Sequence, residues 1–142
     1  MRRLNQGKFD VKTFTVKLDT DKTAQLLIEA VAAYPMGLVA HINGQANCAK
    51  RGIQVPADQI LEIFRPDLAV RVWAAEKSAG IDIPLRIHLY QKDGKTVVTY
   101  RTAREVFAPY VNPELERIAD ELDGIFDQLL AILEPHCAQE AA

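Results

Sequence analysis

Hydrophobic residues alternate with polar ones along parts of this chain, and this period of two is typical of half-buried strands. The alternation predicts strands over three segments, residues 11–18, 37–43 and 60–64. The third strand ends before Pro66, because proline lacks the backbone N–H that a central strand needs. Two further strands follow from the pattern around residues 85–102.

The segment 85–102 carries two β-rich runs that flank Asp93-Gly94, a dipeptide that favours a two-residue type I′ turn. The pattern therefore predicts a hairpin. A two-residue turn places Leu89 opposite Val98 and Ile87 opposite Tyr100 on the core face. The same register places two further pairs on the other face, His88 opposite Thr99 and Arg86 opposite Arg101.

Spacings of three and four residues elsewhere in the chain predict helices over four segments, residues 21–34, 45–51, 67–77 and 113–133. Thr20 is the expected N-cap of the first helix, and Gly52 provides the left-handed residue that closes the second. Asn112 followed by proline begins the long last helix, and Pro135 ends it.

The order of these elements predicts an α+β fold in one domain that spans residues 1–142. We expect a single mixed, mostly antiparallel sheet of about five strands, with helices packed mainly on one face. Residues 136–142, which are polar and follow Pro135, are predicted to be a disordered tail.

Composition narrows the classes of function. Seventeen Lys and Arg against nineteen Asp and Glu give a net charge of −2 without a run of one sign, so the sequence predicts no nucleic-acid partner. No segment has the roughly 18–20 consecutive apolar residues of a membrane helix. The basic residues at the start of the sequence are not followed by the apolar stretch that an export signal has. Cys48 and Cys137 form no metal knuckle or disulfide framework, which favours a cytoplasmic location.

Several short motifs resemble the domain-of-unknown-function 302 family. They are Gly37-Leu38-Val39-Ala40-His41-Ile42-Asn43, then Ala46-Asn47-Cys48-Ala49-Lys50-Arg51-Gly52, then Val55-Pro56, and finally Ala79-Gly80-Ile81-Asp82-Ile83-Pro84-Leu85-Arg86-Ile87. The resemblance covers about residues 37–92 and implies turn or strand-entry roles for Gly52, Pro66, Asp82 and Pro84. Phe64-Arg65 stands where the family commonly has Gly-Asn. The family implies no established catalytic set, and the sequence leaves the cofactor unknown.

Three residues form a candidate metal site because each lies on a predicted strand. His41, Glu62 and His88 are two imidazoles and a carboxylate, the ligand set of open non-haem iron sites. The alternative interpretation makes His88 a sheet-surface residue beside Tyr90 and His41 a hydrogen-bonded residue near a strand end.

Two arginines form a candidate anion site. Arg86 and Arg101, as cross-strand neighbours, would repel each other unless an anion or an acidic side chain lies between them. The structural alternative is an ion pair, for instance between Asp82 and Arg86.

Cys48 is a weak candidate for a catalytic thiol. Its place early in a short helix, with Lys50 and Arg51 near, favours the thiolate. The alternative is a structural role, because small buried cysteines are common packing residues in helices. The familiar nucleotide-binding and hydrolase motifs are absent from the sequence.

The leading functional hypothesis is a non-enzymatic module that self-associates as a homodimer and holds a small anionic or apolar ligand. It rests on a predicted outer sheet face that bears Tyr90, Val97, His88 and Thr99. The alternative is an enzyme, either metal-dependent through His41, Glu62 and His88 or thiol-dependent through Cys48.

Overall fold

A computed structural model of the chain describes residues 2–3, 11–34 and 36–138. It contains a six-stranded sheet with the order β1-β2-β6-β5-β4-β3, in which every pair of neighbours is antiparallel. The strands are β1 (Arg2–Arg3), β2 (Val11–Val16), β3 (Gly37–Asn43), β4 (Asp58–Phe64), β5 (Leu85–Lys92) and β6 (Lys95–Arg101). The predicted α+β class is confirmed, and the strand added to the five predicted ones is the two-residue β1.

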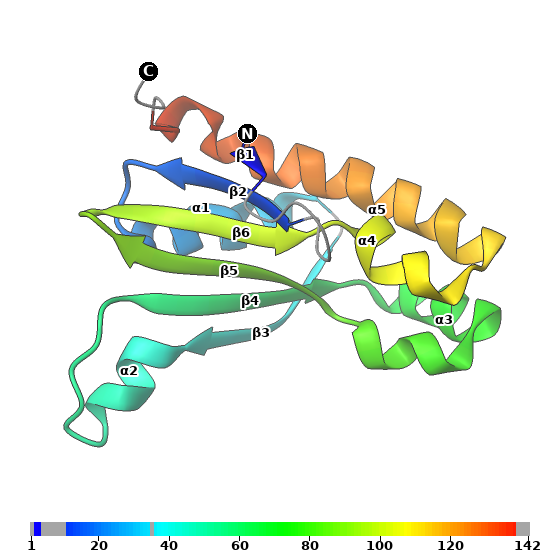
Figure 1. Cartoon of the computed structure of the whole chain (residues 1–142), viewed down its shortest axis with the longest axis horizontal. Helices are drawn as coiled ribbons and strands as arrows, with labels where there is room; N and C mark the ends of the chain where they lie inside the picture. The colour runs from blue at the N-terminus through cyan, green and yellow to red at the C-terminus, as the bar shows by residue number, and fades with distance from the viewer. Residues whose placement is uncertain (1, 4–10, 35, 139–142) are drawn as a thin grey trace.

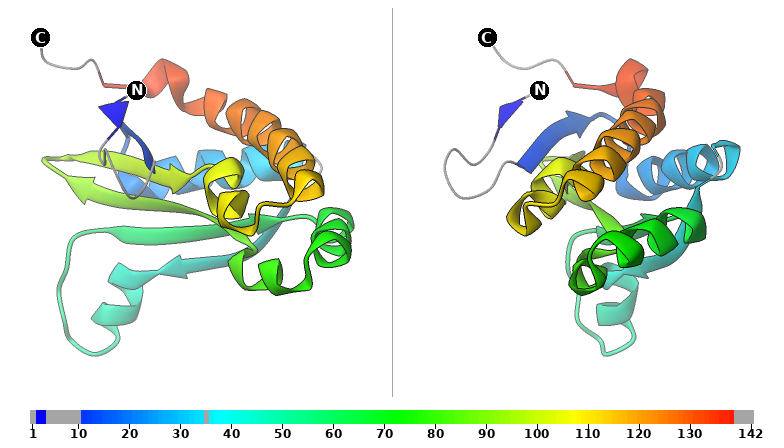
Figure 2. Two further views of the ribbon diagram at one scale, coloured as in Figure 1. Left: turned by 45° about the vertical axis from the view of Figure 1, so that its right-hand side comes forward. Right: turned by 90° about the vertical axis from the view of Figure 1, so that its right-hand side faces the viewer.

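Five α-helices and three 3₁₀ helices connect or follow these strands. They are α1 (Thr20–Ala33), α2 (Gly44–Ala49), α3 (Pro66–Ala75), η1 (Lys77–Asp82), α4 (Ala103–Phe107), η2 (Ala108–Tyr110), α5 (Pro113–Leu130) and η3 (Ala131–His136). Helices α1 and α5 lie on the same side of the sheet, α3 lies near one end of the strands, and α2 continues from the end of β3 (Figures 1 and 2). None of the helices in the described part of the chain has the length and apolar content needed to cross a membrane.

One hydrophobic core lies between the sheet and these helices. Leu61, Ile87 and Leu89 of the central strands are fully buried there, as are Leu27 of α1 and Leu122 of α5. Burying a side chain of this size contributes roughly 1.5–3 kcal/mol to folding. We call the side of the sheet that carries these residues the helix face, and the opposite side the outer face.

Local sequence explains how the main helices begin. Asn112 caps α5, since its side-chain oxygen accepts hydrogen bonds from the backbone N–H groups of Glu114 at 3.0 Å and Leu115 at 3.1 Å. The N-cap of α1 is Asp19, which accepts from Lys22 N at 2.8 Å, so the prediction of Thr20 was wrong by one residue. The Thr20 hydroxyl instead lies 3.1 Å from the Thr96 hydroxyl of β6.

The hairpin has the predicted turn and register. Asp93 and Gly94 both have positive φ angles, 53° and 73°, and Leu89 lies opposite Val98 while His88 lies opposite Thr99. Gly52 has the expected positive φ of 73° as well. Local turn chemistry therefore sets the geometry of β5 and β6.

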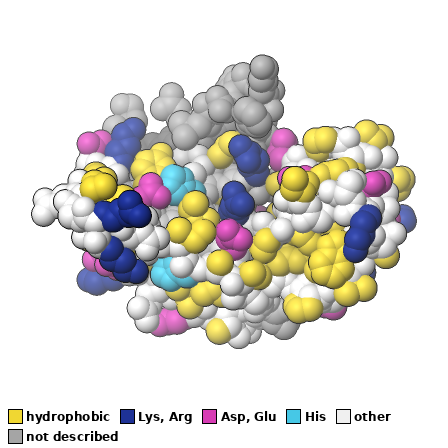
Figure 3. Space-filling model, turned by 90° about the horizontal axis from the view of Figure 1, so that it is seen from below, with side chains coloured by type: hydrophobic (Ala, Val, Ile, Leu, Met, Phe, Trp, Pro, Cys, Tyr) yellow, Lys and Arg dark blue, Asp and Glu magenta, His cyan; other side chains and the backbone are white. Residues whose placement is uncertain are grey.

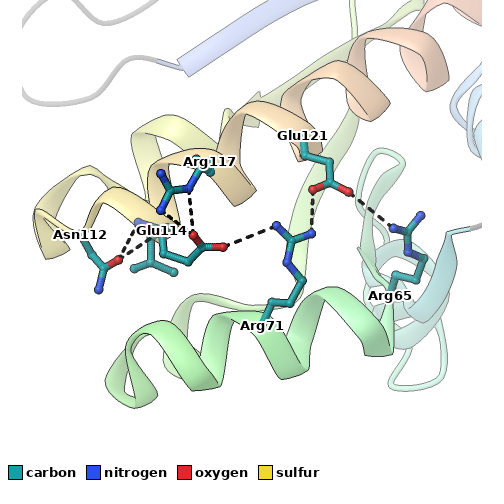
Figure 4. A network of polar contacts seen from close by, with 7 residues as sticks. Arg65, Arg71, Asn112, Glu114, Arg117 and Glu121 are labelled. Carbon is teal, nitrogen blue, oxygen red and sulfur yellow. Dashed lines mark hydrogen bonds and ion pairs between the residues drawn. The ribbon is translucent and has the colours of Figure 1, made fainter.

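Ion pairs on the surface connect α3 with α5 (Figure 4). Arg71 of α3 donates to Glu121 at 2.7 Å and lies 3.7 Å from Glu114, which also contacts Arg117 at 2.8 Å. Arg65 lies 3.9 Å from the other oxygen of Glu121. Because these side chains are all partly exposed, each pair contributes about 0–1 kcal/mol.

The segment 136–138 is not a frayed tail, contrary to the prediction. Lys17 N donates to His136 O at 2.9 Å, and Ala138 N donates to Thr15 O at 2.8 Å. These bonds flank an antiparallel bridge between Val16 and Cys137. The segment thus lies against the outer edge of β2, while the rest of the predicted tail, residues 139–142, lies outside the described residues.

Candidate functional site

The three candidate metal ligands lie on two different faces of the sheet. Directly opposite residues of paired strands point to the same face, so His41 shares the helix face with Leu61, while Glu62 lies on the outer face. His88 lies opposite Ile60 and therefore also on the outer face. The structure does not bring His41 together with Glu62 and His88. Among the described residues, no three His, Cys, Asp or Glu side chains lie close enough to hold one metal ion.

His88 has a local acidic partner on the outer face. Its Nε2 lies 3.0 Å from Asp58 Oδ1, and its ring lies 5.0 Å from that of Tyr90, centroid to centroid. Both His88 and Asp58 are partly exposed. His88 thus lies beside Tyr90, as the structural interpretation expects, and Asp58 is an additional partner that orients its imidazole.

The two candidate anion-binding arginines have different neighbours. Arg86 Nε lies 3.8 Å from Glu62, which stands directly opposite it on β4, so the acidic partner of Arg86 is Glu62. Asp82, the alternative partner considered from the sequence, instead accepts a hydrogen bond from Tyr110. Arg101 lies opposite Val11 of β2, and the paired part of the hairpin stops at Tyr100.

A polar chain that sequence reasoning missed connects α1, β4 and β3. His41 Nε2 lies 2.6 Å from Gln59 Oε1, and Gln59 Nε2 donates to Asp21 Oδ1 at 2.7 Å. Gln59 is only 2% exposed, whereas His41 and Asp21 reach the surface. The place of Gln59 directly before the apolar Ile60 and Leu61 was the signal in the sequence that could have drawn attention to it.

The hydrogen bonds that connect Asp21, Gln59 and His41 fix which nitrogen of His41 carries the proton. An ionised carboxylate only accepts hydrogen bonds, so Asp21 requires the amide nitrogen of Gln59 and turns its oxygen toward His41. His41 Nε2 must then donate, which leaves Nδ1 as the ring's acceptor in the neutral form. The hydrogen bond from Nε2 to Gln59 orients the imidazole, as hydrogen bonds orient catalytic and metal-ligating histidines. Through its contacts with His41 and Asp21, the Gln59 side chain also connects β3 to α1.

The two cysteines are free thiols in different surroundings. Cys48 lies in the six-residue α2 and is partly buried. Cys137 lies in the segment against β2, where its sulfur lies 3.6 Å from Leu133 O. Burial, and secondly the charge of Glu134, raises the pKa of the Cys137 thiol, which disfavours the reactive thiolate.

A surface groove of about 410 Å³ runs between α1 and the segment 136–138. Leu18 and Leu26 form apolar parts of its lining, and Lys22, Glu29 and His136 bring groups of both charges. Its volume is within the range of small-molecule sites. The groove thus combines an apolar lining with charged and polar groups.

The two edges of the sheet differ in how they are covered. At one edge, β1 pairs with Lys12 and Thr13, and the segment 136–138 covers Thr15 to Lys17. The other edge is β3, which pairs only through its inner side with β4 in the described structure. Figure 3 views the molecule from the β3 side and shows hydrophobic side chains there, mixed with charged ones and histidines, and a larger hydrophobic group towards α3.

Comparison with known proteins supports this fold. A family model with the description "Domain of unknown function DUF302" matches residues 12–133, a longer stretch than the resemblance over 37–92. The chain is similar to the crystal structure of an uncharacterized conserved protein DUF302 from Bacillus stearothermophilus, with a TM-score of 0.74 and 21% sequence identity. That match covers 89% of this chain and 97% of the other. None of the curated proteins matches the chain.

Proposed function

This chain belongs to the DUF302 family, and we propose that it is a self-associating binding module whose second copy pairs along β3. The single observation that carries the proposal is that β3, a strand without Lys, Arg, Asp or Glu, is an edge strand of the antiparallel sheet and pairs only with β4 in the described residues. The two free cysteines support a cytoplasmic location as part of the same proposal.

The backbone of β3 is suited to pairing. An edge strand presents unpaired N–H and C=O groups, and natural edges are usually protected by lysine, proline, other charges or a bulge. Residues 37–43 contain no proline and no Lys, Arg, Asp or Glu. The one protective feature is a register shift between Leu38 and Ala40, which leaves Ala40 to Asn43 in regular register.

Apolar side chains accompany this backbone. Of the ten large hydrophobic side chains that are exposed in the described part of the chain, four fall within residues 34–42. Val39 is 59% exposed and Ile42 is 39% exposed. A second copy would remove these side chains from water while it satisfies the backbone groups of β3.

The outer face contributes less than the sequence suggested. Val97, which was expected to be an apolar residue of a face exposed to water, is only 6% exposed. Tyr90 packs its ring near His88, which is paired with Asp58. Three exposed hydrophobic side chains, Leu38, Val39 and Ile42, lie in β3 itself, and we assign the interface to β3.

Size-exclusion chromatography with light scattering tests the interface directly. The chain of 15.8 kDa should elute with twice that mass. Ile42→Lys should yield monomers, because a charge at the pairing edge repels its copy and must be desolvated. Ile132→Lys is the matched control, since Ile132 has a similar exposure of 44% but lies in η3.

The proposal fails if the unmodified chain is monomeric at high concentration, or if Ile42→Lys remains a dimer. A loss of the dimer in both variants would indicate that added charge, rather than the β3 edge, is responsible. Circular dichroism of each variant confirms that a monomer is still folded.

The ligand part of the proposal is assigned to the groove lined by Leu18, Leu26 and His136, which offers an apolar surface beside polar groups. Native mass spectrometry of freshly purified protein, with parallel metal analysis, tests it. A retained mass supports a bound ligand, and a stoichiometric metal would favour the alternative of a metal-dependent enzyme. An empty dimer would restrict the proposal to self-association.

A further inference from the structure

The segment 136–138 occupies the outer edge of β2 as a short antiparallel strand would. Lys17 N donates to His136 O, and Ala138 N donates to Thr15 O, so both bonds run between backbones. Cys137 between them is partly buried and packs against the hydrophobic core. Backbone bonds of this kind recognise an extended chain rather than a particular side chain.

The position of this segment matters because a sheet with two accessible edges has two ways to associate. Next to the segment, β1 pairs with Lys12 and Thr13, so the described chain covers most of the outer edge of β2. When two copies related by a two-fold axis pair through β3, both β3 edges are occupied. The assembly then closes at two, as long as the opposite edge of the described sheet accepts no further strand. If β2 were uncovered, each copy in that dimer would present a second unpaired strand edge, on the side of its sheet opposite β3.

We infer that the segment 136–138, held by its two backbone hydrogen bonds, is an edge cap that limits self-association to two copies. The inference rests on the proposed pairing through β3. When the segment is displaced, Thr15 to Lys17 become a second strand-binding site. Its occupant is the same edge of β2 in another dimer, so that β3–β3 and β2–β2 contacts alternate along an open-ended chain of copies.

Ala138→Pro in the full-length chain tests the inference, because proline has no N–H to donate to Thr15 O. Ala138→Ser keeps that N–H and is the matched control. Two measurements are made on each variant. Hydrogen exchange at the Lys17 amide, which donates to His136 O, reports whether the segment is displaced. Light scattering reports the number of copies.

In Ala138→Pro, the Lys17 amide should lose its protection and species of four or more copies should form with rising concentration. Ala138→Ser should remain a dimer. The combination of Ala138→Pro with Ile42→Lys should stop at two copies, because only the β2 edge can then pair.

Failure of the inference is distinct from failure of the proposed function. If the unmodified chain is a dimer and Ala138→Pro exposes Lys17 without larger species, the edge of β2 does not accept a strand and the inference is overturned. Continued protection of Lys17 overturns it too, because the Ala138 bond then does not hold the segment. A monomeric unmodified chain refutes pairing through β3, whereas its dimerisation on Ala138→Pro would still support the edge cap.

Discussion

Replacement of Tyr100 by Phe should make the chain less sensitive to alkaline pH. Tyr100 of β6 is 5% exposed, and its ring lies 6.1 Å from that of Phe126 in α5. Burial, and then the charges of Asp127 and Asp123, raises the pKa of its phenol from 10.0 to about 12. Phe retains the packing of the ring and removes the group that titrates.

The size of the effect follows from this pKa shift. Because the folded state raises the pKa of Tyr100, it favours the neutral phenol. The stabilisation is complete below pH 10.0 and is lost as pH rises through about 12. One pKa unit corresponds to roughly 1 kcal/mol, so the contribution of Tyr100 should fall by roughly 1 kcal/mol at about pH 11 and by roughly twice as much above the folded pKa.

Urea denaturation of the unmodified chain and of Tyr100→Phe, at about pH 8 and about pH 11, measures this contribution. The difference in the free energy of unfolding between the two proteins isolates Tyr100, because lysines and other tyrosines titrate in both. An ultraviolet absorbance titration should also show one late-ionising phenol that is missing from the variant. A difference that is the same at both pH values would refute the reasoning.

Three further substitutions test the packing by urea denaturation. Gly37→Ala should destabilise the fold by about 1–3 kcal/mol, because its Cβ would lie 2.9 Å from Phe64 O. Gly124→Ala lies inside α5, and apart from the helix's own backbone nothing lies within 4 Å of the added Cβ, so it should stabilise the fold by about 0.5–1 kcal/mol. The opposite signs of the two changes check each other. Arg71→Met should lower the free energy of unfolding by at most about 1 kcal/mol, because it removes the ion pair with Glu121. The loss should be smaller at high salt, which screens this ion pair in the unmodified chain.

Features determined by nearby residues were predictable from the sequence. The turn at Asp93-Gly94 fixes the register of the hairpin, since its length sets which residues of β5 and β6 face each other. Asn112 followed by proline marks the beginning of α5 in the same way. These elements carry their signals within a few residues, so no knowledge of the remaining chain is needed.

For β3, the sequence did not show which residues face the helices and which lie on the outer face. Alternation shows that Ala40 and Ile42 share a side, and His41 lies on the other, but an edge strand with exposed residues on both sides does not reveal which side meets the helices. The apolar side proved to be the outer face. The predicted grouping of His41 with Glu62 and His88 depended on that choice.

Contacts between segments far apart in the sequence were also beyond reach. The segment 136–138 appeared to be a tail because it follows Pro135, which ends the predicted helix, and its partner β2 lies more than a hundred residues away. A backbone edge accepts an extended segment of almost any sequence. No pattern within the segment itself could therefore indicate the contact.

The hydrogen bonds that link Asp21, Gln59 and His41 were unpredictable for the same reason. The position of the proton on His41 can be tested. Since Asp21 accepts only, His41 Nε2 should hold its proton in the 2.6 Å contact with Gln59. We expect a slowly exchanging ring N–H signal of His41 in proton NMR. Gln59→Leu should abolish this signal and cost about 1–2 kcal/mol, because both partners of Gln59 reach water and are not left unsatisfied.

His88 is the internal control for that measurement, because its Nε2 contact is to Asp58 on the other face of the sheet. The signals of His88 should be unchanged in Gln59→Leu. If the His41 signal survives the substitution, the proton is held by another group and the chain is not what orients the ring. If the signal disappears while the stability is unaffected, Gln59 positions His41 without tying β3 to α1, which would favour a chemical role for the imidazole over a structural one.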